Sequence, residues 1–432
     1  MTDIYEIAEY TLKALKNCGA DAAQCIVGRS KKDELNVDGG KFSLMRSTFN
    51  TSISMKAIKD GKKGVTSINQ ATKEAIDEAA AQCIAAAESS VPDEAEQIAP
   101  FTAKAEYKTG VFEPDLNKLF DRIEEFMSQT KKEYPKVILE QLISDYEHSE
   151  KLYMNTNGTS LRYEHGEYSF NTMFSAHEGE KASSFNGYFC ALDNLDKPFM
   201  DAGMQRQLLK ESEKQLNTVS PSEKFVGKVI YSPDCFNELL QTALENFASS
   251  GVLIDGTSPW KDALNTKVAS ENLNLRSVPL DDRTVVGQRF TSDGYPAENM
   301  DIIVDGVLKT FILSQYGANK TGFPRALNGG NNLEVLPGDK TLEEMIAGID
   351  KGLIVNRFSG GQPSSNGDFS GVAKNSFLIE NGKVSSAVSE TMISGNIIDM
   401  LNNIVAISKE QTTDGLSFMP WAEFDGVTVS GK

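Results

Sequence analysis

Residues 33–45, DELNVDGGKFSLM, and residues 52–68, SISMKAIKDGKKGVTSI, together indicate the fold class of this chain. Each stretch places Asp-Gly between two arms with an apolar pattern, which is the strongest local signal for a β-hairpin. Residues 3–18 before them and about 70–88 after them carry apolar side chains at helical spacing. A helix, two hairpins and a second helix in succession predict an α+β fold.

The rest of the 432-residue chain continues the same mixture and predicts several units. Two further hairpins, DIIVDGVLKTFIL at 301–313 and SFLIENGKVSSAV at 376–388, turn at Asp-Gly and Asn-Gly. We expect an N-terminal α+β subdomain at 1–88, a linker without periodicity at 89–113, a strand-rich middle subdomain at 114–220 and a β-rich α+β domain at 221–432.

Composition and charge exclude some classes of function. Asp and Glu number 61 against 43 Lys and Arg, a net charge of −18 that repels nucleic-acid backbones, so we expect no direct nucleic-acid binding. No run approaches the roughly 18 apolar residues of a membrane helix, and the start, MTDIYEIAEY, has no signal-peptide pattern. Five widely spaced cysteines without a CxxC pair indicate reduced thiols. We therefore expect a cytoplasmic protein that does not bind membranes.

Histidine chemistry is confined to one part of the chain. All three histidines lie between residues 148 and 177, and a metal site would need His165 and His177 to meet across strands. Glu164, Glu167 or Glu178 could then contribute a carboxylate, although surface histidines in turns explain the pattern as well. No GxSxG motif is present.

Residues 232–247, SPDCFNELLQTALENF, predict an amphipathic helix with Ser232 as its N-cap and Pro233 in its first turn. Its apolar residues recur at steps of three and four, which indicates one buried stripe. Cys235 lies in the first turn, where a thiol pKa falls, but neighbouring acidic residues oppose this effect, so we expect a structural, buried cysteine. Later in the chain, the glycine-rich stretch 358–371, FSGGQPSSNGDFSG, is either a groove-lining segment for an extended peptide or a surface loop.

The second half of the chain resembles the TldD/PmbA family, named modulator of DNA gyrase and described as zinc-dependent peptidases. The stretches that carry the resemblance are SPDCFNELLQTALENFASSGVLIDG, FTSDGYPAENMDIIVDGVLKTFILSQYGANKTG, GDFSGVAKNSFLIENGKVSSAVSETMISGNIIDMLNNI and DGLSFMPWAEFDGVTVSGK. Together they span most of 226–432, and the first half resembles the family more loosely.

The resemblance implies a changed metal site. In the TldD branch the helix corresponding to 232–247 carries HExxxH, and a cysteine in the closing segment completes the zinc site. Here the histidine positions fall on Gln241 and Asn246, the glutamate position falls on Thr242, and no cysteine follows Cys235. Amides are poor zinc ligands, and threonine cannot act as the general base. The chain is therefore similar to the PmbA, or TldE, branch, and the resemblance implies no catalytic and no metal-binding residue in it.

The resemblance further implies a non-catalytic, zinc-free subunit of a two-component TldD/TldE metallopeptidase. Its partner would be a TldD-like chain that holds the zinc, and the pair would act in the cytoplasm on flexible or unfolded peptides. Two alternatives stay open: an autonomous hydrolase with a displaced site near His165 and His177, and a scaffold or binding homodimer without a peptidase role.

Overall fold

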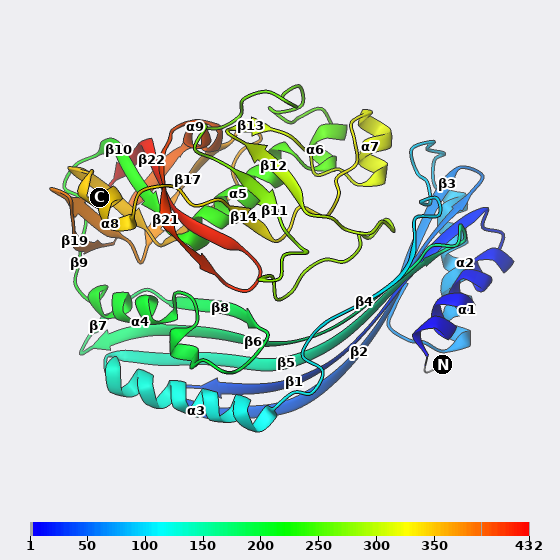
Figure 1. The fold of residues 1–432 in the computed structure, drawn as a ribbon, viewed down its shortest axis with the longest axis horizontal. Coiled ribbons are helices and arrows are strands. Elements are labelled where there is room, and N and C mark those ends of the chain that lie inside the picture. The colour runs from blue at the N-terminus through cyan, green and yellow to red at the C-terminus, as the bar shows by residue number, and fades with distance from the viewer. Residues whose placement is uncertain (1–2, 390, 432) are drawn as a thin grey trace.

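The computed structural model describes residues 3–389 and 391–431. It contains 24% helix and 42% strand, arranged as mixed sheets with helices packed on them, so the predicted α+β class is confirmed. Two sheets organise the chain, one for each half of the sequence (Figure 1). The described helices are all too short or too polar to cross a membrane.

The first sheet is built from very long strands. Its main path runs β3-β2-β1-β5-β6-β4, and β7 and β8 both pair with β6. Its longest strands reach 19 residues, or about 60 Å at 3.3 Å per residue, and they bend together along their length (Figure 1). The bounds are β1 Ala22–Asp38, β2 Lys41–Lys59, β3 Lys62–Ile68, β4 Lys104–Gly110, β5 Val137–Asn155, β6 Ser160–Glu178, β7 Lys181–Ala182 and β8 Asn186–Leu192.

The predicted hairpins of the first half are confirmed. The β1–β2 turn follows Asp38, and the β2–β3 turn is Asp60-Gly61, with positive φ at both residues. The two predicted helices also form: α1 Ile4–Asn17 and α2 Lys73–Ser89 lie together at one end of the sheet (Figure 1). A further helix, α3 Leu116–Glu133, covers the outer face of the sheet (Figure 1). The shorter η1 Phe199–Asp201 and α4 Gln205–Lys214 lie near β8.

The stretch 89–113 does more than connect two units. Its residues 104–110 form β4, which pairs in parallel with β6. Strands from 1–88 and from 114–220 lie in this same sheet, because residues 24–38 of β1 pair with residues 141–155 of β5. The predicted domain boundaries, with the linker at 89–113, remain a prediction, and residues 104–110 of that stretch form a strand of the first sheet.

The described residues of the second half form a sheet of many short strands with five helices. The strands are β9 Thr218–Val219, β10 Phe225–Tyr231, β11 Leu275–Ser277, β12 Met300–Val304, β13 Val307–Leu308, β14 Leu333–Val335, β15 Lys351–Val355, β16 Arg357–Gly360, β17 Asp368–Lys374, β18 Phe377–Glu380, β19 Lys383–Val388, β20 Met392–Asn396, β21 Ile404–Thr413 and β22 Phe418–Ser430. The helices are α5 Pro233–Phe247, α6 Ser250–Ile254, α7 Gln315–Thr321, α8 Leu342–Ala347 and α9 Ile397–Asn402. The predicted turns Asp305-Gly306 and Asn381-Gly382 both form, with positive φ at all four residues.

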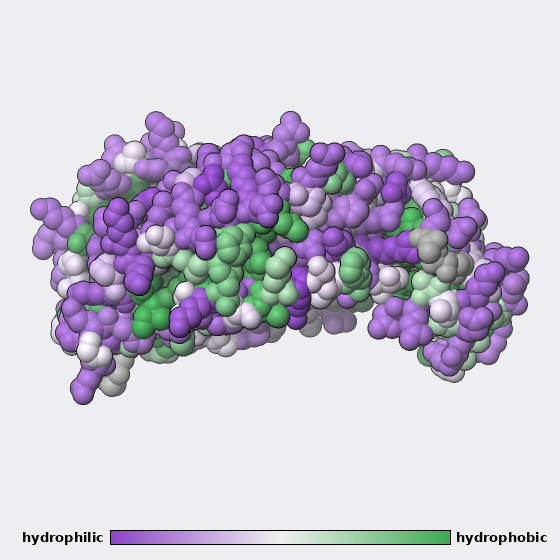
Figure 2. All heavy atoms as spheres, turned by 90° about the horizontal axis from the view of Figure 1, so that it is seen from below, coloured by the Kyte–Doolittle hydropathy of each residue, from purple (hydrophilic) through white to green (hydrophobic). Residues whose placement is uncertain are grey.

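The second half lies over the inner side of the long sheet (Figure 1). One hydrophobic cluster joins the two: it includes Phe170 and Leu209 of the first half and Ile354 and Trp421 of the second. Seen from below, the molecule is largely hydrophilic, with an apolar area near the middle of this face (Figure 2). The shared core fixes the two sheets against each other and leaves a cleft further along the long strands.

Candidate functional site

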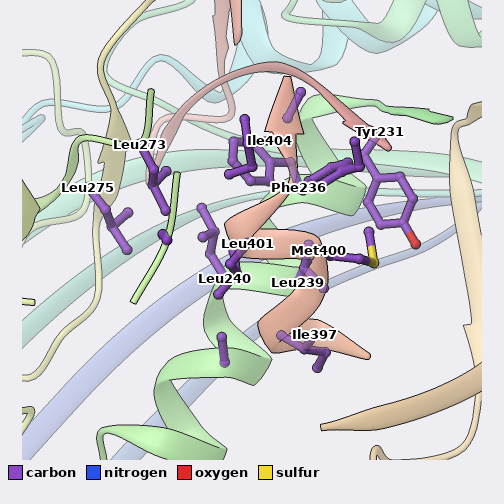
Figure 3. Packing of buried hydrophobic residues seen from close by; sticks show 14 of the residues in the cluster. Tyr231, Phe236, Leu239, Leu240, Leu273, Leu275, Ile397, Met400, Leu401 and Ile404 are labelled. Atoms are coloured by element: carbon purple, nitrogen blue, oxygen red, sulfur yellow. The ribbon is translucent and has the colours of Figure 1, made fainter. Parts of the chain in front are cut away.

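Helix α5 is held in place by the apolar stripe that the sequence predicts. Ser232 caps its N-terminus by accepting the Cys235 N–H at 3.5 Å. Leu239 and Leu240 lie close to Met400 and Leu401 of α9 (Figure 3). The other buried residues of the helix are Pro233, Cys235, Phe236, Ala243, Leu244 and Phe247. The remaining positions therefore face outward from this core.

A cavity of about 900 Å³ lies between α5 and the long sheet; we call it the main cleft. Asn237 and Gln241 of α5 line one wall. Strands β1, β2 and β5 supply the opposite wall, with hydroxyl-bearing Ser30, Ser52 and Ser149 among its residues. The segment 286–290 and the end of the β21–β22 connection complete the lining. The main cleft thus lies between a polar face of α5 and a polar surface of the long sheet.

The three positions that the resemblance assigns to zinc chemistry do not converge on one point. Gln241 lines the main cleft, and its amide nitrogen lies 3.5 Å from the Asn237 side-chain oxygen. Thr242 instead lines a second cavity of about 320 Å³. The Asn246 amide donates to the Thr242 carbonyl at 3.1 Å and so binds its own helix.

This donor set does not fit zinc. Gln241 and Asn246 offer neutral amides, Thr242 offers a hydroxyl, and zinc prefers imidazole and thiolate. In the part of the chain that the structure describes, no three His, Cys, Asp or Glu residues are placed to hold a metal ion.

His165 and His177 do not form one site. Both lie on β6, twelve residues apart, which is about 40 Å along a strand. His165 is buried, with Nδ1 at 2.8 Å from the Thr109 hydroxyl, whereas His177 is partly exposed near Ser175 and Glu140. The expectation that the two histidines could meet across strands is wrong, because they share a strand.

Cys235 and the 358–371 stretch border the second cavity. Cys235 is buried, and burial raises its thiol pKa to about 12, so it is unsuited to act as a nucleophile. All five cysteines are free thiols, and four of them are buried. Residues 358–363, which include the end of β16, line the cavity beside Thr242 and Glu238. The glycine-rich stretch is therefore part of a cavity wall.

A third cavity, about 620 Å³, contains acidic residues that sequence reasoning missed. It shares Asn237 and Asp414 with the main cleft, so the two are contiguous along α5. Burial between the walls of this cavity, followed by the negative charges of Asp414 and Glu238, raises the pKa of Asp234 to about 6. The Asp234 side chain nevertheless keeps access to solvent. Asp414 accepts the N–H groups of Leu416 and Ser417. No local pattern could have paired Asp234 with a residue 180 positions away.

Comparison with known proteins places this arrangement among metallopeptidase relatives. A family model of the PmbA/TldA metallopeptidase C-terminal domain matches residues 224–431, and one of PmbA/TldA metallopeptidase domain 1 matches residues 23–87. The chain is 29% identical over 220 residues to a zinc metalloprotease TldD homolog of Saccharolobus solfataricus, covering 47% of this chain and 49% of that protein. It is 31% identical over 155 residues to the metalloprotease PmbA of Escherichia coli O157:H7, covering 35% and 34%. The match thus spans about half or less of the length of these two curated relatives.

A solved structure matches over the full length. The crystal structure of TldE from Thermococcus kodakarensis aligns with a TM-score of 0.83 and 21% identity, covering 98% of this chain and 100% of that one. At this identity the likeness establishes the fold. It includes both the long bent sheet and the β-rich second half.

Proposed function

The chain belongs to the TldD/PmbA family of metallopeptidases, and from that membership we propose that it is a PmbA/TldE-like subunit without catalytic activity of its own. It works in a two-component peptidase whose TldD-like partner holds the zinc. This chain supplies part of the surface that encloses a flexible or unfolded peptide.

One observation carries the proposal: the chemistry and direction of the three side chains at 241, 242 and 246. A zinc peptidase needs ligands that aim at one ion and a carboxylate that activates its water. Gln241 and Thr242 line different cavities, and Asn246 is bonded to its own helix. None of the three carries an imidazole, thiolate or carboxylate.

The main cleft supports the peptide-enclosing role. Hydroxyl groups on the sheet wall and amide groups on the helix wall can donate and accept hydrogen bonds with a peptide backbone, whatever its sequence. The cavity volume of about 900 Å³ lies in the range of small-ligand sites and accommodates a few residues of an extended chain.

The test is a reconstitution. The purified chain should hold no stoichiometric zinc and should not cleave an unfolded polypeptide such as reduced, alkylated casein, while the mixture with its TldD-like partner should cleave it. Asn246→Ala in this chain should leave the activity of the pair nearly unchanged, because the Asn246 amide binds its own helix. Gln241→Ala removes an amide from the wall of the main cleft and should weaken cleavage. Replacing the first zinc histidine of the partner should abolish it.

Two outcomes would contradict the proposal. Cleavage of the polypeptide by this chain alone would make it an enzyme in its own right. Failure of the chain to bind or activate any TldD-like protein, together with formation of a stable homodimer, would favour the scaffold role.

A further inference from the structure

The main cleft contains a lysine without a partner. Lys151 lies on β5, directly opposite Gly28 of β1 on one side and Tyr163 of β6 on the other. It lines the cleft, and within residues 3–389 and 391–431 it makes no hydrogen bond, ion pair or cation–π contact. Burial alone lowers its pKa, with no carboxylate acting against it. Its ammonium group is therefore available to an anion that enters the cleft.

A second cation, Arg289, lies beside Tyr163. The Arg289 guanidinium carbon lies 5.9 Å from the centre of the Tyr163 ring, and its Nη1 donates to the Pro279 carbonyl at 3.3 Å. Arg289 lines the main cleft and forms no ion pair within the described part of the chain. Lys151 and Arg289 thus both neighbour Tyr163 and approach it from different halves of the molecule.

The two acidic residues of the cleft lining already have ion-pair or hydrogen-bond partners. Glu150 binds Arg162, with 2.6 Å between Oε1 and Nη2, and Asp414 accepts backbone N–H groups at 2.7 and 2.8 Å. The chain has a net charge of −18, yet Lys151 and Arg289 line this cleft without a carboxylate partner among the described residues. A bound anion would gain charge-assisted hydrogen bonds from both in a partly desolvated setting.

We propose that Lys151 and Arg289 bind a carboxylate of the enclosed peptide, either its C-terminal group or an aspartate or glutamate side chain. This inference rests on the proposed function, because it takes the ligand of the main cleft to be a peptide. Asn237 and Gln241 on the facing wall then lie within the same cleft to bind the adjoining backbone. Recognition of this carboxylate makes the two-subunit peptidase prefer unfolded segments that carry a carboxylate at the matching position.

The test uses calorimetric titration of the full chain with three short, unstructured Gly-Ser peptides. One has a free C-terminus and no acidic side chain, one has an amidated C-terminus and a single glutamate, and one is amidated with glutamine in place of the glutamate. We expect tighter binding of one or both acids than of the neutral peptide. The acid that gains affinity identifies which carboxylate is bound.

Lys151→Met should weaken binding of the preferred acidic peptide about tenfold, equivalent to about 1.4 kcal/mol, and leave binding of the neutral peptide unchanged. Lys151→Arg should restore most of the lost affinity because the charge returns. Lys13→Met on α1 removes a lysine outside the cleft and is the matched control. Thermal unfolding of each variant verifies that it is folded.

Three results would overturn the inference: equal binding of all three peptides, no binding of any of them, or equal weakening of all three by Lys151→Met. Displacement of the acidic peptide by a single-stranded oligonucleotide at similar concentration would also overturn it, because the site would then select any polyanion. These failures leave the proposed function standing if the reconstituted pair still cleaves casein. Conversely, an inactive pair with intact acid preference defeats the proposed function alone.

Discussion

At the scale of single residues, Glu167 is the most perturbed carboxyl group of the long sheet. Burial, followed by the charges of Glu147 and Asp145, raises its pKa to about 7, and Lys32 opposes this only in part. Its Oε2 lies 3.2 Å from Nε2 of His165, and neither atom has a hydrogen-bond partner in the described structure. A protonated Glu167 could donate to that nitrogen, whereas an ionised one cannot.

The pKa of Glu167 predicts a pH-dependent stability. A carboxyl group whose folded pKa is raised from 4.5 to about 7 contributes most below pH 4.5, and this contribution is lost as pH rises toward 7. Glu167→Gln keeps a neutral side chain of similar shape, so it should be more stable than the wild type at pH 8, by up to about 3 kcal/mol. Urea unfolding at pH 5 and pH 8 measures the difference.

Glu180→Gln, at an exposed position beyond the end of β6, is the matched control and should show no such pH dependence. Equal stability of Glu167→Gln and wild type at both pH values would refute this assignment. The titratable groups that lie close to Glu167 are Lys32, Asp145, Glu147 and His165.

At the scale of elements, close packing of α2 on β3 depends on one glycine. A Cβ atom at Gly64 would lie 1.9 Å from the Cys83 carbonyl oxygen and 2.8 Å from the Ala87 nitrogen. Both are backbone atoms of a helix whose inner face is buried, so neither can move aside without shifting the whole helix.

Gly64→Ala should therefore lower the free energy of unfolding by about 1–3 kcal/mol, the usual range for overpacking. Gly361→Ala, at a position with nothing within 4 Å of the added Cβ, is the control and should have an effect within about 0.5 kcal/mol. Thermal or chemical denaturation followed by circular dichroism compares the two. Equal effects of both substitutions would show that α2 does not pack tightly on β3.

At the scale of the whole molecule, one core couples the two halves. Trp421 of β22 is 6% exposed and belongs to the same cluster as Phe126 of α3 and Phe170 of β6. The main cleft depends on this contact, because its two walls come from different sheets. A weaker core should therefore affect both halves and not only the second.

Trp421→Ala should lower the free energy of unfolding by about 3–5 kcal/mol and keep a single transition. The control Val405→Ala on β21 removes a side chain that is 38% exposed and should change stability far less. Calorimetry distinguishes the outcomes. Two separate unfolding transitions, with only one of them shifted to a lower midpoint temperature by Trp421→Ala, would mean that the halves unfold independently.

Local sequence patterns were sufficient for much of the fold. Asp60-Gly61, Asp305-Gly306 and Asn381-Gly382 turn where predicted, because their side chains tolerate positive φ. Ser232 starts α5, and the apolar stripe of that helix faces the core. Helix α8 ends at Ala347, and β15 begins at Lys351 and pairs with β10.

The sequence by itself thus determined the hairpins, the helices, the α+β class and the chemistry of Gln241, Thr242 and Asn246, since each of these depends on side chains and their immediate neighbours. Only the tertiary structure decided that Gln241 and Thr242 line different cavities, that His165 and His177 stay apart on one strand, and that Lys151 and Arg289 flank one tyrosine. The physical reason is that strand register and the packing of one sheet over another bring distant residues together, and no local spacing encodes those contacts.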